Sequence, residues 1–99
     1  MAFVAYERKI PVKGDYDVIV AGGGPSGFIA AIAAARSGAR TAVIERNAFL
    51  GGTATAGMVA PISVCCFDGE LVQGGIHWEF IQRLEAEGGK AKGFPPCSP

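Results

Sequence analysis

The chain has 99 residues, a length that allows no more than one small domain. Its nine basic and nine acidic residues cancel, and the basic ones are spread along the chain, so there is no electrostatic case for nucleic acid or an anionic membrane as a partner. A hydrophobic fraction of 49% favours a packed globular chain over a disordered one.

Residues 1–14 are expected to form an N-terminal arm. The tetrapeptide FVAY could be a short extended piece, but Pro11 and Gly14 then interrupt any regular pattern. The folded part of the chain is therefore expected to comprise residues 15–99.

The next part of the chain predicts a strand, a helix and a second strand. Residues 17–21 lie in a short run rich in valine and isoleucine that ends at a glycine, as in strands covered on both faces. A helix is predicted over residues 25–37, because Pro25 suits a first helical turn, several alanines follow, and Gly38 can end the helix. A second strand is predicted over residues 41–45. This order constitutes a βαβ unit, in which the two strands run parallel.

The uncharged run of 18 residues from Val18 to Ala35 has the length at which a membrane span is considered. Four successive helix-breaking residues, Gly22 to Pro25, lie inside this run, and lipid cannot satisfy the backbone groups that they leave unpaired. A signal peptide fits badly as well, because acidic residues precede the run where a basic segment is expected. No membrane partner is therefore expected.

The remainder of the chain carries a weaker signal. Residues 47–61 predict a loop of small residues, residues 62–67 a strand or an extended segment, and residues 68–75 turn and loop. Residues 76–87 predict a helix, because apolar residues recur on one of its faces: Ile76, Phe80, Ile81 and Leu84. Residues 89–99 are rich in glycine and proline and are not expected to be regular.

Two parallel strands do not make a complete sheet. The expected fold class is therefore α/β, with a βαβ unit, a loop and a further helix, and with a sheet that is incomplete in this chain. We infer that these residues are either the amino-terminal piece of a larger protein or a truncated product.

The three cysteines, Cys65, Cys66 and Cys97, do not indicate a disulfide framework, because their number is odd and two are adjacent. No Cys-x-x-Cys pair occurs and His77 is the single histidine, so no metal site is expected. Reduced thiols in a cytoplasmic protein are the expectation.

The glycines that follow the first strand match the dinucleotide-binding fingerprint, Gly22-x-Gly24-x-x-Gly27. Alone the match is weak, because 15 of the 99 residues are glycine, but its place between a predicted strand and helix strengthens it. Gly22 allows the sharp turn, Gly24 lets a diphosphate approach the backbone, and Gly27 lets the helix pack against the strands. The N–H groups of the helix start would hold phosphates, and Ser26 could add a hydroxyl donor or be an ordinary first-turn residue. A tight turn without a ligand is the alternative.

Glu45 ends the second strand, 18 residues after Gly27, where the fingerprint requires an acidic residue. Its carboxylate would accept hydrogen bonds from ribose hydroxyls, and it would repel a 2′-phosphate, which argues against NADP. The alternative is a solvated charge at the end of a strand.

The segment DVIVAGGGPSGFIAAIAAARSGARTAVIER, followed by LGGTATAGM, resembles the amino-terminal segment of FAD-dependent oxidoreductases with a glutathione-reductase-type Rossmann domain. The resemblance covers residues 16–89 and implies a partial Rossmann-type FAD-binding domain over residues 15–99, with FAD as the cofactor. It implies that Glu45 contacts the adenosine ribose and that Arg46 lies beside the adenine.

The same resemblance implies that the glycine pair Gly51-Gly52 and the following Thr53 pass near the pyrophosphate and the ribityl chain of FAD. A flexible turn is the alternative for this pair. The candidate cofactor-binding residues are Gly22, Gly24, Pro25, Ser26, Gly27, Glu45, Arg46, Gly51, Gly52 and Thr53.

The chain departs from the flavin disulfide reductases in this second loop. Those proteins carry two redox cysteines where this chain has Ala54 and Val59, and Cys65 and Cys66 come too late to replace them. Disulfide reduction is therefore not expected, and the adjacent cysteines favour ordinary thiols over a redox pair. His77 could approach a substrate, or it could be an ordinary residue at a helix start. No catalytic residue is assigned, because a flavin performs the electron chemistry itself.

The leading hypothesis is the FAD-binding portion of a flavoprotein oxidoreductase. Its substrate would be a small molecule of unknown identity, and its partner would be the remainder of a larger flavoprotein. The alternative is a non-catalytic or truncated module that binds NAD or another adenine dinucleotide. The short length supports this alternative, whereas the loop at Gly51-Gly52-Thr53 counts against NAD.

Overall fold

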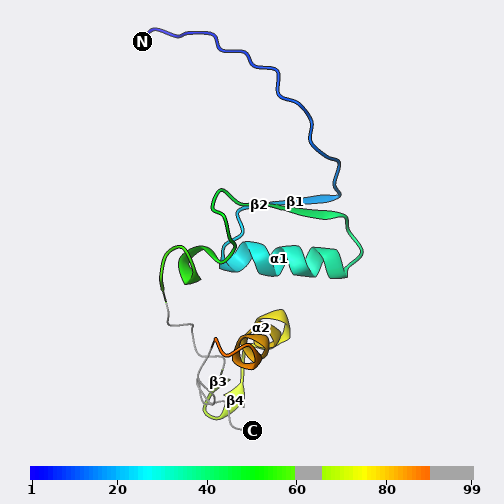
Figure 1. The fold of residues 1–99 in the computed structure, drawn as a ribbon, viewed down its shortest axis with the longest axis vertical. Helices are drawn as coiled ribbons and strands as arrows, with labels where there is room; N and C mark the ends of the chain where they lie inside the picture. The colour runs from blue at the N-terminus through cyan, green and yellow to red at the C-terminus, as the bar shows by residue number, and fades with distance from the viewer. Residues whose placement is uncertain (60–65, 90–99) are drawn as a thin grey trace.

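The computed structural model describes residues 1–59 and 66–89. The elements follow one another as β1 (Val18–Ala21), α1 (Pro25–Arg36), β2 (Thr41–Ile44), the 3-10 helix η1 (Gly52–Ala54), β3 (Cys66–Phe67), β4 (Glu70–Leu71) and α2 (Gly75–Ala86). Figure 1 shows three layers, in which α1 lies between the β1–β2 sheet and α2. The arm over residues 1–14 leads away from these layers without helix or strand. Among the described residues, no helix is long and apolar enough to cross a membrane.

The predicted βαβ unit is confirmed, and its bounds differ from the expected ones by no more than one residue. β1 and β2 pair in parallel, with Val18 opposite Thr41 and Ala21 opposite Ile44. The alanines of α1 favour the helix and also let it lie close to the sheet, where Ala31 is buried. Because the strands are parallel, their carboxyl ends meet at the same edge, next to the start of α1.

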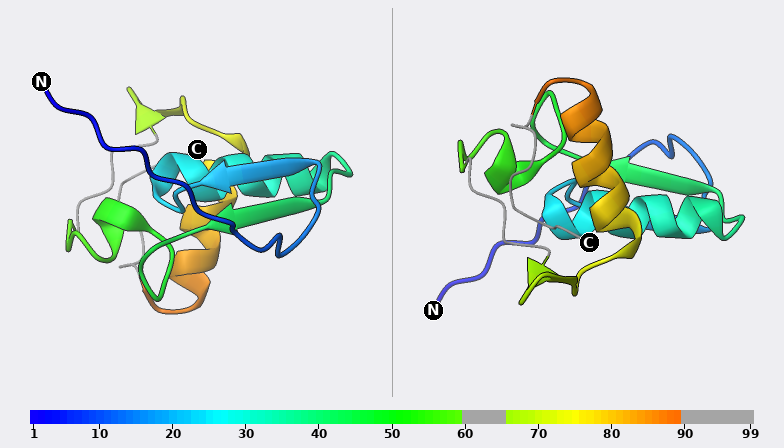
Figure 2. Two further views of the ribbon diagram at one scale, coloured as in Figure 1. Left: turned by 90° about the horizontal axis from the view of Figure 1, so that it is seen from above. Right: turned by 90° about the horizontal axis from the view of Figure 1, so that it is seen from below.

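The predicted second helix is confirmed as α2, which packs on the side of α1 that faces away from the sheet. Figure 2 shows α2 crossing α1 when the structure is seen from below. Among the described hydrophobic side chains, Ile81 is the most buried, at 2% exposure. The rings of Phe28 on α1 and Phe80 on α2 lie 5.2 Å apart at a tilt of 57°, an arrangement that aromatic pairs favour. The apolar face that was expected from the sequence is therefore the face that contacts α1.

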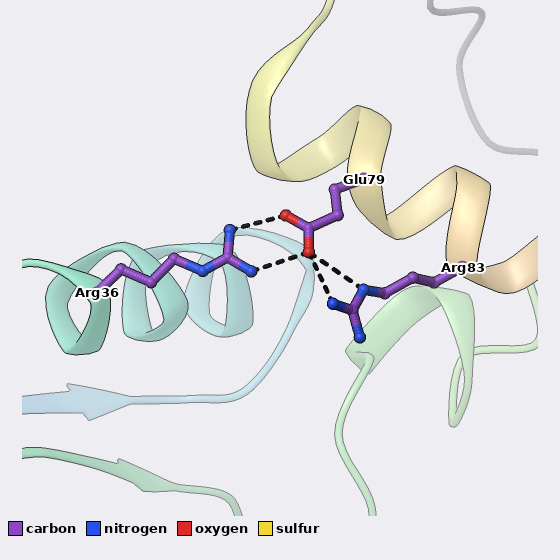
Figure 3. A network of polar contacts seen from close by, with 3 residues as sticks. All are labelled: Arg36, Glu79 and Arg83. Carbon is purple, nitrogen blue, oxygen red and sulfur yellow. Dashed lines mark hydrogen bonds and ion pairs between the residues drawn. The ribbon is translucent and has the colours of Figure 1, made fainter.

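A network of Arg36, Glu79 and Arg83 also joins the two helices (Figure 3). Arg36 donates to both carboxylate oxygens of Glu79, at 2.7 and 2.9 Å, and Arg83 Nε donates to one of them at 3.1 Å. A planar guanidinium that donates two bonds to one carboxylate fixes the orientation of both groups. The bonds from Arg36 are the main cause that lowers the pKa of Glu79 from 4.5 to about 2.

β3 and β4 pair antiparallel in a short hairpin. Asp68 (φ 51°) and Gly69 (φ 79°) form its two-residue turn, and positive φ at both positions is typical of a type I′ turn. The prediction of turn and loop over residues 68–75 is therefore wrong at β4, because the Asp-Gly turn returns the chain along β3. The strand predicted over residues 62–67 is present as β3, and residues 62–65 lie outside the described part of the chain.

Cys66, the first residue of β3, is disulfide-bonded. The prediction of three reduced thiols is therefore wrong for this residue, because residue spacing does not reveal which sulfur atoms the fold brings together. Cys65 and Cys97 lie outside the described residues.

The sheet face that points away from α1 is apolar and remains uncovered by the described residues. Ile19 on β1 is 56% exposed and Ile44 on β2 is 60% exposed. Parallel sheets are normally covered on both faces. With two strands and one open face, the predicted incompleteness of the sheet is confirmed.

We expect Gly27→Ala to lower the free energy of unfolding by about 1–3 kcal/mol, the usual cost of overpacking. A Cβ at Gly27 would overlap the carbonyl oxygen of Gly22 and lie 2.9 Å from its carbonyl carbon, so backbone would have to move. Gly74→Ala is the control, because a Cβ there meets nothing within 4 Å. Chemical denaturation of the full chain measures both, and equal stability of the two variants would contradict this packing.

We expect Glu79→Gln to destabilise the protein at neutral pH and to lose this effect in acid. The lowered pKa of Glu79 means that its stabilisation is complete above the ordinary value of 4.5 and disappears as the pH falls toward about 2. The measurement is the difference in denaturation midpoint between wild type and variant from pH 7 to pH 2. Glu87→Gln, which removes an equal charge from the end of the same helix, is the control. If the difference in denaturation midpoint between wild type and Glu79→Gln does not change with pH, the network of Arg36, Glu79 and Arg83 contributes nothing to stability.

Candidate functional site

The candidate site begins where β1 ends. Gly22 adopts the left-handed conformation (φ 98°), which glycine tolerates far better than other residues, and its N–H donates to the Ile44 carbonyl at the end of β2, at 2.8 Å. This bond ties the turn after β1 to the last residue of β2. The chain then enters α1 within three residues. The sharp turn that was predicted at Gly22 is therefore present.

The start of α1 is open toward an incoming group. Gly24 is the N-cap residue and no side chain caps the helix, so the first N–H groups remain available for an anion. Pro25 is the first helical residue, no acidic residue occupies the first turn, and Ser26 is exposed there. A Cβ built on Gly24 would meet no atom closer than the Gly52 Cα, at 4.0 Å. The space in front of Gly24 could therefore receive a ligand but would be filled by a branched side chain.

A second glycine segment packs directly against this start. The Gly51 N–H donates to the Gly23 carbonyl at 2.8 Å, and both residues are buried. A Cβ on Gly52 would lie 2.9 Å from the Gly24 Cα, so only glycine allows the two segments to approach this closely. Thr53 follows in η1, where it is exposed. The predicted pair Gly51-Gly52 therefore packs against the first glycine loop.

Glu45 follows β2 directly and its carboxylate lies between two backbone segments. One oxygen, Oε2, accepts a bond from the Gly23 N–H at 2.8 Å, and Oε1 accepts one from the Asn47 N–H at 3.2 Å. The bonds from Asn47 and then Gly23 are the largest causes that lower the pKa of Glu45. The carboxylate thus lies beside the glycine loop, hydrogen-bonded to two backbone segments.

Two other residues were singled out in the sequence, Arg46 and His77, and His77 shares a cavity with the candidate residues Pro25, Gly51 and Thr53. Arg46 is exposed, and its charge is the smallest of the effects that lower the pKa of Glu45. His77 is half-buried on α2 and lines an apolar cavity of about 760 Å³. This cavity lies between α1, β2, the second glycine loop and α2, with Phe28, Ile32, Val43, Leu50 and Phe80 among its lining residues. In the part of the chain that the structure describes, no group of His, Cys, Asp or Glu could hold a metal ion.

Gly23 is the residue of this site that the fingerprint did not single out. The fingerprint assigns roles to Gly22, Gly24 and Gly27 and leaves the residue between the first two open. The run of three successive glycines was the available signal. A Cβ on Gly23 would press on the end of the Leu50 side chain and lie 3.3 Å from the Glu45 carboxylate, so a larger residue here would require these side chains to shift.

Comparisons with known proteins show which family the sequence matches. The sequence model of the family described as FAD dependent oxidoreductase matches residues 17–97. Dihydrolipoyl dehydrogenase of Trypanosoma brucei brucei is 50% identical over 48 residues, which make up 48% of this chain and 10% of that protein. The mitochondrial dihydrolipoyl dehydrogenase of Homo sapiens is 56% identical over 39 residues, or 39% of this chain and 8% of that protein. Leghemoglobin reductase of Glycine max is 57% identical over 37 residues, or 37% of this chain and 7% of that protein.

The matched part of the chain therefore spans no more than a tenth of the length of these curated relatives. No solved structure matches the chain.

We expect Gly52→Ala to separate the two glycine segments, because its Cβ would press on the Gly24 Cα. The Gly51 amide should then lose its bond to the Gly23 carbonyl and exchange its hydrogen at least about ten-fold faster. Gly38→Ala is the matched control, because Gly38 is also left-handed (φ 94°) but has nothing within 4 Å of a built Cβ. Hydrogen exchange read by NMR or mass spectrometry measures both. Equal protection of the Gly51 amide in the two variants would show that the segments do not interlock.

Proposed function

The chain belongs to the FAD-dependent oxidoreductase family, and on this premise we propose that it forms the part of a flavoprotein oxidoreductase that holds the diphosphate and the adenosine ribose of FAD. The single observation that carries the proposal is the open space in front of Gly24, at the uncapped start of α1. A diphosphate carries negative charge, and a helix start offers N–H donors together with the positive end of the helix dipole. The residues present therefore fit this part of the cofactor.

Each candidate residue has a role in this proposal. Gly22 turns the chain, and Gly24 leaves room for the diphosphate. The first-turn N–H groups, with the Ser26 hydroxyl, hydrogen-bond the phosphate oxygens. Gly27 keeps α1 against the strands, and Pro25 starts the helix without using an N–H group. The segment Gly51-Gly52-Thr53 lies along the diphosphate toward the ribityl chain.

Glu45 is proposed to accept hydrogen bonds from the hydroxyls of the adenosine ribose, with Arg46 beside the adenine. Its carboxylate lies at the carboxyl end of β2 in the charged form, which supports this role. A negative charge there would repel a 2′-phosphate and so disfavour NADP. When FAD is bound, the flavin supplies the electron transfer, and the residues of this chain bind and orient the cofactor.

We infer that electron transfer does not pass through a cysteine pair in the second glycine loop. Ala54 and Val59 occupy the positions at which the resemblance to flavin disulfide reductases would require cysteines. Neither side chain can form a disulfide or carry a thiolate. Dihydrolipoyl dehydrogenase chemistry is therefore not proposed for this protein, although relatives of that name match its first half.

Residues 15–99 are proposed to form the N-terminal part of an FAD-binding domain that follows an arm over residues 1–14. The exposed Ile19 and Ile44 support a further protein layer over the sheet, contributed by the remainder of a larger flavoprotein. The substrate is proposed to be a small molecule whose identity this chain does not specify. A cytoplasmic location stays a prediction.

We expect Gly24→Val to lower the affinity for FAD by at least about a hundred-fold, or about 2.7 kcal/mol, while the fold is retained. The branched side chain would fill the space that the diphosphate needs, and no protein atom opposes it within less than 4.0 Å. Gly74→Val is the matched control, because Gly74 is the N-cap of α2, has the same extended backbone and is equally open. FAD and NAD are titrated against the flavin-free protein, with circular dichroism as the check on folding.

An FAD affinity of Gly24→Val equal to that of Gly74→Val would refute the proposed cradle. Tighter binding of NAD than of FAD by the wild type would favour the alternative of an NAD-binding module.

A further inference from the structure

Gly23 is buried among the described residues, and its N–H and its carbonyl are hydrogen-bonded to two distant segments. The Gly23 carbonyl accepts a bond from the Gly51 N–H at 2.8 Å, and the Gly23 N–H donates to Glu45 Oε2 at 2.8 Å. Gly23 and Gly51 are both buried. A buried backbone N–H without an acceptor is costly, so the Glu45 carboxylate satisfies a donor inside the glycine loop itself.

The Glu45 carboxylate is held on its second side as well. Its Oε1 accepts a bond from the Asn47 N–H at 3.2 Å, so the group links the end of β2 to the loop after β1. Each carboxylate oxygen can accept two hydrogen bonds. The two bonds to backbone therefore leave acceptor capacity for ribose hydroxyls, and a backbone role is compatible with a role in ribose binding.

We propose that Glu45 is also a positioning residue, whose carboxylate holds the buried N–H of Gly23 and thereby sets the shape of the diphosphate-binding loop before any ribose is bound. The inference rests on the proposed function, because it concerns the same cofactor site. It also means that the Gly23 N–H is occupied by Glu45, so the phosphates are bound by the N–H groups at the start of α1.

The two roles of Glu45 make different demands on the ligand. A residue that only binds ribose matters to ligands with ribose hydroxyls and to no others. A residue that shapes the loop matters to every ligand that places a diphosphate there, with or without those hydroxyls. ADP and 2′,3′-dideoxy-ADP form the required pair of probes, because both carry the diphosphate and only ADP carries the two hydroxyls.

The experiment measures the affinities of ADP and 2′,3′-dideoxy-ADP by calorimetry, on the flavin-free wild type and on Glu45→Ala and Glu45→Gln. We expect Glu45→Ala to lower the affinity for dideoxy-ADP by about five-fold or more, because the Gly23 N–H loses its bond to a charged group. The affinity for ADP should fall further, because the bonds to its ribose hydroxyls are lost as well. Glu45→Gln keeps a carbonyl oxygen for the Gly23 N–H and should restore most of the dideoxy-ADP affinity. Hydrogen exchange of the Gly23 amide, measured without ligand, should be slow in wild type and Glu45→Gln and fast in Glu45→Ala.

Asp17→Ala is the matched control. Asp17 Oδ2 accepts a bond from the Arg40 N–H at 2.8 Å, so it makes the same kind of carboxylate-to-backbone link at the opposite end of the β1–β2 sheet. This variant should change neither probe affinity nor the exchange of the Gly23 amide. If it changes both as Glu45→Ala does, the effect is a general loss of sheet stability and the inference is wrong.

The remaining outcomes separate the inference from the proposed function. If Glu45→Ala weakens ADP alone and the Gly23 amide stays protected, the positioning role is wrong while the FAD-binding proposal stands. If the wild type binds neither ADP nor FAD, the positioning role of Glu45 and the FAD-binding proposal are both wrong. If Glu45→Ala does not fold, Glu45→Gln decides: slow exchange at Gly23 with retained dideoxy-ADP binding supports the inference, and fast exchange overturns it.

Discussion

The buried contact between the Gly23 and Gly51 peptides is the constraint on which the rest of the site depends. It brings the loop after β1 and the loop after β2 together in front of α1, at the shared carboxyl edge of two parallel strands. A Cβ on Gly23 would press on the Leu50 side chain, and one on Gly51 would press on Thr55. Gly51 also has a left-handed backbone (φ 115°) that favours glycine, and Glu45 completes the arrangement by accepting a bond from the Gly23 N–H.

The position of α1 follows from layers that hold it on both sides. Small side chains bring it close to the sheet, and aromatic packing and the Arg36–Glu79 ion pair attach α2 to its other face. Among the described residues only Ala31 and Ile81 are buried hydrophobic side chains. The site is thus ordered mainly by backbone hydrogen bonds and by close glycine packing, and less by a large apolar core. The open sheet face is of the kind that a complete α/β sheet covers.

The curated relatives match this chain over only a small share of their own length. The family match extends over residues 17–97, but the segments matched by the curated relatives amount to no more than 10% of their length. The family match contains the βαβ unit, the part of the fold that would hold a dinucleotide. The residues of this chain therefore support the proposal of cofactor binding, whereas they do not specify the substrate. The absence of cysteine at Ala54 and Val59 is the clearest difference in chemistry from the flavin disulfide reductases.

The amino-acid sequence by itself determined the βαβ unit and the glycine and glutamate positions of the candidate site. These depend on local properties: a valine-rich run ended by glycine, an alanine-rich helix, and a fixed spacing between glycines and an acid. Only the tertiary structure decided that Glu45 reaches the Gly23 N–H, 22 residues away, and that Gly51 bonds the Gly23 carbonyl. It also decided the disulfide of Cys66. The physical reason is that residue types reveal which groups can donate and accept, whereas the path of the backbone decides which of them come within hydrogen-bonding distance.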